Sequence, residues 1–375
     1  MKKSLLIIAL AFAAVSCADK AQELALIPQE NFTQEVYGKQ VSLYTLAAGD
    51  ITMQVTNYGG RVVSLWTPDR NGHKEDIVLG YETLDRYLNN TGERYLGACV
   101  GPVANRIGNA RFEIDGTEYS VEANEGGLKC LHSGIGGVDL KVWDVVETTE
   151  NSIVLHYLAA DGEGGFPGNR DINMTYTLTP ENCFEIKYAV TTDAPTYFNI
   201  SHHSFFNLQG EGNGDNLAYE MVINADSITP VDSLLIPTGE FMPVDGTPFD
   251  FREPHTIGER IGEDHQQLKY GNGYDHNWVL NRSGDGVEFA ASVYDPEFGR
   301  YLEVFTDQIG LQFYAGNFFD GTTTGKTGKP FNHRATVVLE TQKFPDSCNQ
   351  PSFPSIRLNP GETYTQTCIY KFSAK

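Results

Sequence analysis

The feature that most restricts the fold of this chain is a two-residue alternation of apolar and polar side chains. Residues 172–178 read Ile-Asn-Met-Thr-Tyr-Thr-Leu, and residues 184–190 and 368–372 repeat the pattern. Successive side chains on a β-strand point to opposite faces of the sheet. The alternation therefore predicts strands with one apolar, buried face and one polar face.

Turn and helix signals support the same fold class. Residues 112–121 are expected to form a hairpin, because Asp115 and Gly116 supply the two positive-φ residues that a tight turn requires. Helical patterns are limited to short candidates at residues 83–88 and 256–268, whereas glycine (38 residues) recurs throughout. We therefore predict an all-β fold, a large antiparallel β-sandwich.

One folded domain is expected over residues 30–375. A length of 375 residues would suggest about two domains, but all-β architectures often run longer as one unit. No linker rich in Pro, Ser and Gly divides the chain. Functional side chains are thus expected to come from distant segments and to meet on one sheet face or on the loops above it.

The first residues resemble a bacterial export signal. Two lysines follow the initial methionine, an apolar run covers residues 5–15, and Ser16 precedes Cys17. A cysteine directly after a small residue is similar to the lipobox of bacterial lipoproteins. We therefore expect residues 1–16 to be a removed signal peptide, Cys17 to carry a diacylglycerol, and residues 17–29 to tether the lipid to the fold.

This interpretation places the protein on the periplasmic side of the inner or outer membrane, as a monomer attached to the bilayer only through its lipid. The alternative is an ordinary cleaved signal with a coincidental cysteine. The other cysteines show no CxxC spacing, so neither a zinc site nor a redox motif is expected. They are interpreted as ordinary buried residues, although export permits one disulfide: Cys99, Cys130, Cys183, Cys348 and Cys368.

Charge and missing motifs exclude several function classes. The net charge of -22 argues against nucleic acid or other phosphate-rich partners, because they require basic surface. The chain contains no Walker P-loop, HExxH helix, GxSxG elbow or EF-hand loop. A neutral small-molecule ligand is easier to reconcile with this composition.

Polar groups within strand-like segments are the candidates for chemistry. The strand-like run 336–339 ends in Glu340, where burial would raise the carboxyl pKa toward that of a general base unless Arg106 lowers it again. In the tandem His202-His203 only one ring can enter a given pocket, because strand neighbours diverge. The local pattern leaves open which ring that is. The same divergence argues against a metal held by this pair, and no metal site is predicted.

Seven stretches taken together resemble the aldose 1-epimerase, or galactose mutarotase, family over almost the whole mature chain. The resemblance implies a β-supersandwich that interconverts the α and β anomers of a free monosaccharide, such as glucose or galactose, by acid/base ring opening without a cofactor. The stretches are residues 104–107, 131–134, 161–169, 203–208, 274–277, 312–317 and 339–342, the last followed by Pro345 and Asp346.

Carried over residue by residue, the resemblance implies that Glu340 is the general base and that His203, not His202, is the general acid. A histidine has an ordinary pKa near ~6.5, which suits a proton donor near neutrality. Hydroxyl-binding partners fall on Asn105, Arg106, His132, Asp275 and Gln312. Pro102, Ser133 and His202 depart from the usual family pattern, and they leave the preferred sugar open.

Two other functions remain open from sequence. One is a non-catalytic carbohydrate-binding lipoprotein, since sandwiches host many sugar-binding modules. The other is a hexose-phosphate epimerase, which would need a cluster of Lys or Arg that the motifs lack. Three aromatic residues near the motifs, Trp278, Phe313 and Phe318, are candidates for an apolar sugar-binding face, although core packing is commoner for aromatics in a sandwich.

Overall fold

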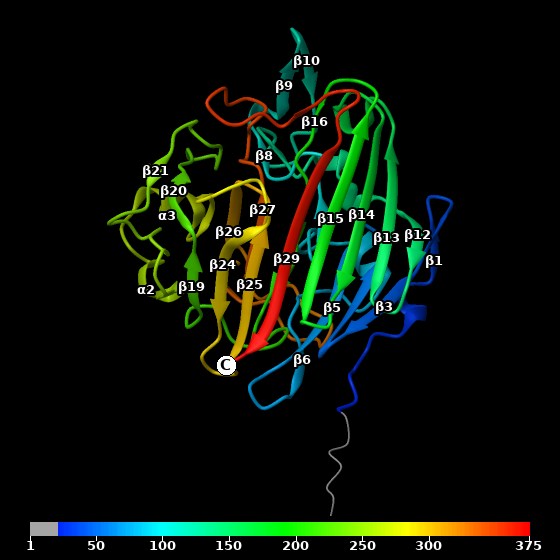
Figure 1. The fold of residues 1–375 in the computed structure, drawn as a ribbon, viewed down its shortest axis with the longest axis vertical. Coiled ribbons are helices and arrows are strands. Elements are labelled where there is room, and N and C mark those ends of the chain that lie inside the picture. Colours follow the sequence, from blue (N-terminus) through cyan, green and yellow to red (C-terminus); the bar gives the residue numbers. More distant parts are fainter. Residues whose placement is uncertain (1–21) are drawn as a thin grey trace, which may run out of the picture.

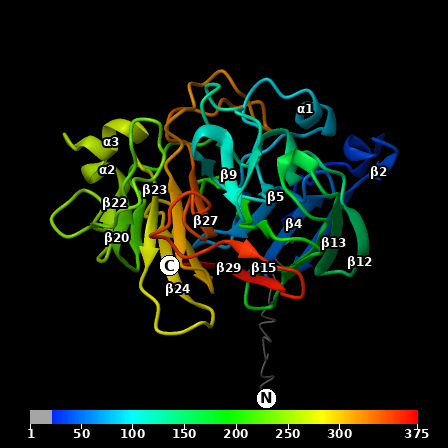
Figure 2. The same cartoon turned by 90° about the horizontal axis from the view of Figure 1, so that it is seen from above.

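The computed structural model describes residues 22–375, and strands make up most of its regular structure (Figure 1). The largest sheet has nine antiparallel strands, several of which line one side of the molecule in Figure 2. In spatial order they are β12 (Asp144–Thr148), β13 (Ser152–Ala159), β14 (Arg170–Leu178), β15 (Cys183–Thr192), β29 (Tyr364–Ala374), β25 (Arg300–Thr306), β24 (Glu288–Tyr294), β19 (Glu220–Ile223) and β22 (His255–Thr256).

Two further sheets pack against the nine-stranded sheet through a shared apolar core. The six-stranded sheet has the order β18 (Phe205–Phe206), β27 (Val337–Gln342), β26 (Gly310–Tyr314), β23 (Asp275–Leu280), β20 (Ala225–Thr229) and β21 (Met242–Pro243). The four-stranded sheet is β3 (Leu43–Ala48), β4 (Ile51–Thr56), β5 (Arg61–Pro68) and β6 (Lys74–Asp76).

Short paired strands, three small α-helices and five 3₁₀-helices complete the regular structure of the described residues. The 3₁₀-helices are Gln29–Phe32, Gly108–Ala110, Gly134–Gly136, Val138–Leu140 and Glu163–Gly165. The pairs are β1 (Gln34–Val36) with β2 (Lys39–Val41), β7 (Ala98–Val100) with β17 (Ser201–His203), β8 (Arg106–Ile107) with β11 (Cys130–Leu131), β9 (Arg111–Ile114) with β10 (Thr117–Ser120), and β16 (Thr196–Tyr197) with β28 (Arg357–Leu358). The α-helices are α1 (Leu84–Leu88), α2 (Ile257–Arg260) and α3 (Gln266–Gly271).

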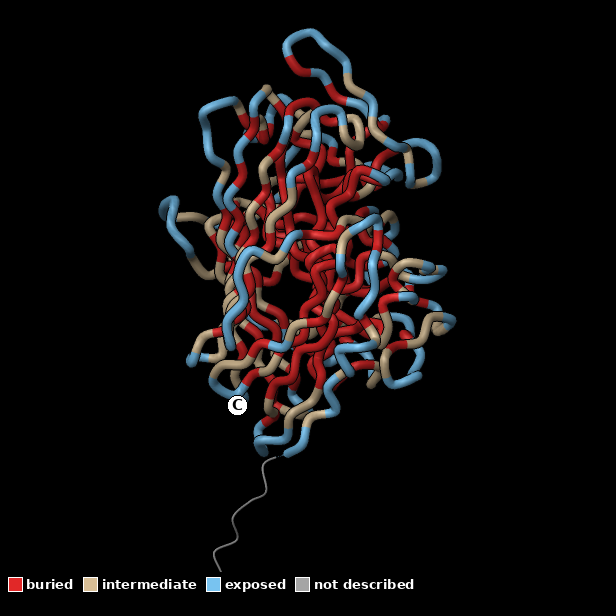
Figure 3. Tube along the Cα trace, turned by 90° about the vertical axis from the view of Figure 1, so that its right-hand side faces the viewer, coloured by how far each residue is buried: buried red, intermediate tan, exposed pale blue. Residues whose placement is uncertain are grey.

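The core joins the three sheets. Val62 on β5, Tyr176 on β14 and Phe313 on β26 belong to one cluster of buried side chains. Each large apolar side chain buried in this way contributes roughly 1.5–3 kcal/mol to folding. Figure 3 shows the buried segments running through the centre of the molecule, with exposed residues concentrated at the loop tips. The prediction of an all-β sandwich is confirmed.

The local predictions hold with one difference. Buried and less buried residues alternate along β14 and β15, as the two-residue pattern predicts. The hairpin of β9 and β10 turns at Asp115 and Gly116, whose φ angles are 52° and 80°. The single helix expected at residues 256–268 is instead divided into α2 and α3. The imidazole of His265 accepts a hydrogen bond from the backbone N–H of Gln267 and so caps a new helix start.

The described part of the N-terminal segment lies against the domain. The side chain of Gln22 exchanges two hydrogen bonds with the backbone of Lys74 on β6, and that of Gln54 on β4 exchanges two with the backbone of Ile27. The expected signal peptide and Cys17 lie outside the described residues. Among residues 22–375, no helix is long and apolar enough to cross a membrane.

The five cysteines of the described chain carry free thiols. Cys99, Cys130 and Cys368 are buried, in agreement with their interpretation as ordinary core residues, whereas Cys183 and Cys348 are partly exposed. Burial raises the pKa of all five thiols. Each is therefore held in the protonated, unreactive form.

The two adjacent histidines on β17 point to opposite sides of the strand. His202 faces the core, where its Nδ1 lies 3.2 Å from the Tyr176 hydroxyl and its Nε2 lies 2.6 Å from Oγ of Ser204. Its ring also contacts Phe184 edge-on, with centroids 5.5 Å apart. Burial, with a smaller contribution from His203, lowers the pKa of His202 to about 3. The ring is therefore neutral in the folded protein.

This burial predicts a pH-dependent contribution to stability. Below about pH 6.5 the unfolded chain protonates His202 while the folded protein does not, so this residue reduces the free energy of unfolding as pH falls toward about 3. A His202→Asn variant has no imidazole at this position, so its free energy of unfolding does not include this decrease at low pH. The stability advantage of wild type over the variant should therefore shrink by about 2 kcal/mol between pH 7 and pH 4.5, as measured by urea unfolding. A difference that stays constant with pH would contradict the prediction.

Candidate active site

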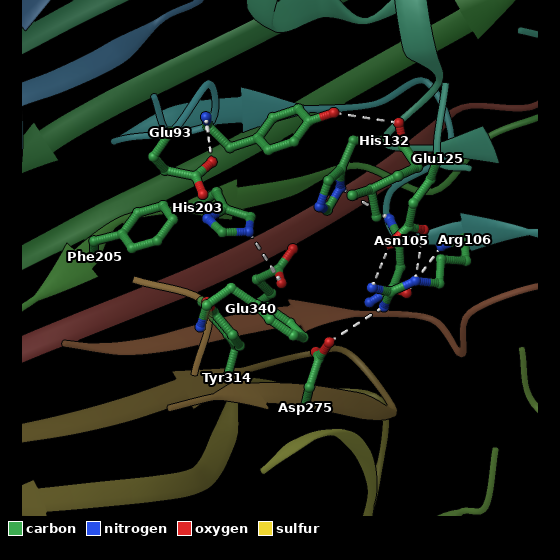
Figure 4. A pocket seen from close by; sticks show the side chains of 13 residues that line it. Glu93, Asn105, Arg106, Glu125, His132, His203, Phe205, Asp275, Tyr314 and Glu340 are labelled. Carbon is green, nitrogen blue, oxygen red and sulfur yellow. Dashed lines mark hydrogen bonds and ion pairs between the residues drawn. The ribbon is translucent and has the colours of Figure 1, made fainter. Parts of the chain in front are cut away.

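A cleft that is open to solvent brings most of the predicted site residues together (Figure 4). The space enclosed within it is about 150 Å³. The wall combines ionisable groups with aromatic rings, contributed by segments far apart in sequence. The lining residues are Glu93, Tyr95, Asn105, Arg106, Glu125, Leu131, His132, His203, Phe205, Asp275, Tyr314, Phe318 and Glu340.

Strand register in the six-stranded sheet positions the acidic groups. Glu340 on β27 lies directly opposite Gln312 on β26, and Tyr314 on β26 lies opposite Asp275 on β23. The sequence indicated that Glu340 closes an apolar strand, but β27 continues to Gln342 and is buried along its whole length. The carboxylate is therefore held at the middle of a strand, where its backbone is fixed on both sides.

Glu340 and His203 form the centre of the cleft. Oε1 of Glu340 lies 3.5 Å from Nε2 of His203, and both side chains are almost fully buried. Its second oxygen, Oε2, has no hydrogen-bond partner within residues 22–375. Burial raises the pKa of Glu340 well above its usual value, and the Asp275 carboxylate adds to the rise while Arg106 opposes it. Of the two outcomes considered from sequence, the raised pKa prevails.

His203 is shifted in the opposite direction. Its ring packs among Phe205, His132 and Tyr95, with centroids 4.8, 5.1 and 5.9 Å away. Burial lowers the pKa of His203 to about 3, well below the ordinary value expected from sequence. The pair therefore favours a neutral imidazole beside a protonated carboxyl group, because the low polarity of their surroundings disfavours separated charges.

Arg106 is clamped between two carboxylates. It donates from Nε and Nη2 to both oxygens of Glu125 at 2.9 and 3.0 Å, and from Nη1 to Asp275 at 3.4 Å. Gln312 donates from Nε2 to the other oxygen of Asp275 at 2.7 Å. Gln312 thus lies behind Asp275 and fixes it, and it does not line the cleft itself.

The tautomer of His132 is set by Asn105. The backbone N–H of Asn105 donates to Nδ1 of His132 at 3.0 Å, and the backbone N–H of His132 donates back to the Asn105 carbonyl at 2.9 Å. Burial also lowers the pKa of His132 well below its usual value. A neutral ring whose Nδ1 accepts a hydrogen bond must carry its proton on Nε2. His132 therefore offers a hydrogen-bond donor to a ligand in the cleft.

This tautomer bears on metal binding. Single ligand atoms of His132, His203 and Glu340 lie within 4.8 Å of one another, a spacing that could hold an ion. Metal ligation requires an unprotonated imidazole nitrogen. The Nδ1 of His132 is already occupied by Asn105, and its Nε2 carries the proton. The cluster is consequently better suited to hydrogen bonding than to holding a metal.

Sequence reasoning missed several lining residues. Glu93, Tyr95 and Glu125 lie on irregular segments without any repeating pattern, and only the folded chain places them at the cleft. Tyr314 lies within the stretch 312–317 that resembles the aldose 1-epimerase family, but the resemblance implied no role for it. Of the three aromatics proposed as a sugar-binding face, Trp278 and Phe313 are core residues, and only Phe318 lines the cleft.

The three departures from the family pattern lie behind the cleft. His202 faces the core, and Pro102 and Ser133 are not among the lining residues. Oγ of Ser133 accepts a hydrogen bond from the backbone N–H of Val103 and donates one to its carbonyl, both at 3.0 Å. These residues can influence the cleft only through the segments that they support.

Comparison with known proteins agrees with this geometry. The family model described as aldose 1-epimerase matches residues 42–371. The galactose mutarotase of Sus scrofa is 40% identical over 333 residues, covering 89% of this chain and 94% of that protein. The aldose 1-epimerase of Escherichia coli K12 is 34% identical over 327 residues, covering 87% and 93%.

Solved structures give the same result. An aldose epimerase homologue from C. elegans superposes with a TM-score of 0.82 at 28% identity, covering 89% of this chain and 99% of that one. Galactose 1-epimerase from Lactobacillus acidophilus superposes with a TM-score of 0.78 at 26% identity, covering 91% and 97%. Fold, sequence and the contents of the cleft therefore agree that this chain belongs to the aldose 1-epimerase family.

Proposed function

We propose that the protein interconverts the α and β anomers of free hexoses, such as glucose and galactose, with Glu340 as general base and His203 as general acid. The observation that carries this proposal is the buried pair itself. A carboxyl group and an imidazole lie 3.5 Å apart at the centre of a cleft, and burial shifts their pKa values in opposite directions. Such opposed shifts are typical of groups that exchange protons during catalysis.

The reaction moves two protons. Glu340 takes the proton of the anomeric hydroxyl while His203 delivers one to the ring oxygen, and the C1–ring oxygen bond breaks to give an open-chain aldehyde. Rotation about the C1–C2 bond presents the other face of the carbonyl. The ring hydroxyl then attacks it, and each proton returns to the group that supplied it. No cofactor is consumed.

The starting proton arrangement is reached within the pair. A protonated carboxyl beside a neutral imidazole and a carboxylate beside an imidazolium contain the same number of protons, so the charged form requires no proton from solvent. Hydrogen bonding to the charged form favours it. A sugar whose anomeric hydroxyl donates to Glu340 and whose ring oxygen accepts from His203 therefore prepares the pair for catalysis.

The remaining groups orient the sugar. Nε2–H of His132 and the guanidinium of Arg106 are fixed donors that can stabilise negative charge developing on oxygen. Asp275, held by Gln312 and Arg106, is placed to accept hydrogen bonds from ring hydroxyls, and Asn105 also lines the cleft. We assign substrate-binding roles to His132, Arg106, Asp275 and Asn105, whereas Gln312, the fifth residue expected to bind the sugar, acts by holding Asp275 in place.

The charge of the cleft favours a free sugar over a sugar phosphate. Among residues 22–375, three carboxyl groups besides Glu340 line it, namely those of Glu93, Glu125 and Asp275, whereas Arg106 is the single Lys or Arg in its wall. That guanidinium is already engaged by two carboxylates. A phosphate would need unpaired cationic donors. The hexose-phosphate alternative is accordingly disfavoured.

Replacing the base should abolish catalysis and preserve the fold. Glu340→Gln keeps the shape of the side chain but cannot accept a proton, so the rate should fall by about 10²–10⁴-fold. Polarimetry of freshly dissolved α-glucose and α-galactose measures the rate, and circular dichroism checks the fold. A wild-type protein that binds both sugars but accelerates neither would instead support the non-catalytic binding protein.

The paired histidines provide a matched control for the acid. His203→Asn should reduce the rate nearly as much as loss of the base, because His203 alone faces the cleft. His202→Asn should keep the wild-type rate within a fewfold range when measured below its melting temperature. A large loss at His202 with none at His203 would reverse the assignment.

We also propose that Cys17 is the lipidated first residue of an exported lipoprotein and that the folded domain begins near residue 30. The support is the signal-like sequence that precedes Cys17. In a bacterial host, a Cys17→Ser variant should lose its lipid and move from the membrane fraction to the soluble fraction, as followed by fractionation and by mass spectrometry of the mature N-terminus. Equal membrane association of both proteins would contradict lipidation at this residue.

A further inference from the structure

Glu93 is a carboxyl group in the cleft wall that the proposed reaction does not use. It belongs to an irregular segment between α1 and β7 and lies beside Tyr95, on the cleft side of that segment. In Figure 4, Glu93 lies on one side of the Glu340–His203 pair, whereas Arg106 and Asp275 lie on the other. The cleft thus has a second acidic wall, separated from the first by the pair.

Several hydrogen bonds hold this segment in place. The carbonyl of Glu93 accepts from Nδ2 of Asn90 at 2.5 Å and from the Tyr81 hydroxyl at 3.3 Å. Arg94 donates from Nε to Asp139 at 2.8 Å. The backbone N–H of Tyr95 donates to Oε1 of Glu93 at 2.9 Å, which orients the carboxyl group and leaves Oε2 available as an acceptor.

The position of the sugar follows from the proposed function, on which this inference rests. Glu340 fixes the anomeric oxygen and His203 fixes the ring oxygen. The ring then continues from C1 to C2 and C3 on the Glu340 side, where β23 supplies Asp275, which Gln312 of β26 holds in place. On the His203 side the atom after the ring oxygen is C5, which carries the exocyclic C6 hydroxymethyl group.

We propose that Glu93 accepts a hydrogen bond from the C6 hydroxyl and is a specificity-determining residue of this protein. Its carboxyl group is the acidic function on the wall beside His203 and Phe205. Phe205 packs against His203 with the two rings tilted and their centroids 4.8 Å apart, and it supplies the apolar surface against which the C6 methylene packs. Burial raises the pKa of Glu93, and the nearby guanidinium groups of Arg61 and Arg94 oppose that rise.

The test compares galactose with 6-deoxygalactose, which lacks only the C6 hydroxyl. A site built to bind a hydroxyl rejects the analogue without it, because its polar group is left unpaired. Wild type should therefore prefer galactose by about tenfold to a hundredfold in kcat/KM, and dissociation constants from calorimetry should show the same order. Galactose and glucose differ only in their configuration at C4. The ratio of their kcat/KM values should therefore be unaffected by substitutions at Glu93, which is proposed to contact C6.

Substitutions separate recognition from a structural role. Glu93→Ala should lower kcat/KM for galactose to the level of 6-deoxygalactose while leaving 6-deoxygalactose within about twofold. Glu93→Gln, which retains a carbonyl acceptor, should restore most of the preference. As a control, Glu118→Gln removes one negative charge from the exposed ion pair with Arg111. It should leave kcat/KM unchanged for both galactose and 6-deoxygalactose.

Equal losses for both sugars in Glu93→Ala, or a wild type that does not discriminate between them, would overturn the assignment. If wild type accelerated neither sugar, the proposed reaction would fail, and the calorimetric preference would then decide the role of Glu93. A galactose preference in binding that Glu93→Ala removes would support the assignment, and its absence would refute it. The two failures are thus distinguishable.

Discussion

The antiparallel register of β23, β26 and β27 is the constraint on which the site depends. Side chains alternate between the two faces of a strand, so a slip of one residue would exchange the whole set that faces the cleft. Such a slip on β27 would present Leu339 or Thr341 in place of Glu340. Gln312 lies opposite Glu340 in the sheet and donates a hydrogen bond to Asp275. The strand register therefore determines how the two acidic groups are arranged. The correct pairing of these strands therefore also places the acidic groups of the site.

Desolvation then gives these groups their chemistry. The same burial raises the pKa of Glu340 and lowers that of His203, because in both cases it disfavours the charged form. Arg106 does not reverse the shift at Glu340, since its charge is already shared between Glu125 and Asp275. Backbone contacts from Asn105 fix the His132 tautomer. The cleft is thus organised before a ligand arrives, as electrostatic catalysis requires.

Much of the fold and part of the site could be predicted from sequence. Alternation predicted the sheets because it reflects burial directly, and divergence of strand neighbours predicted that only one of His202 and His203 could enter the cleft. The choice of His203 came from family resemblance, since parity alone cannot tell which face is buried. Glu93 and Glu125 could not be found this way, because irregular segments acquire their positions from contacts distant in sequence. The pKa shifts likewise depend on burial, which a linear pattern does not quantify.

The docked segment at residues 22–28 has a consequence for how the protein would sit on a bilayer. With Cys17 as the lipid anchor, five residue steps separate the anchor from Gln22, and a fully extended chain spans at most about 18 Å over that interval. Gln22 is fastened to β6, at the opposite end of the domain from β8 in Figure 1. If Cys17 carried the proposed lipid, the β6 end of the domain would therefore lie close to the bilayer, and β8, which carries Arg106, would lie at the end away from it.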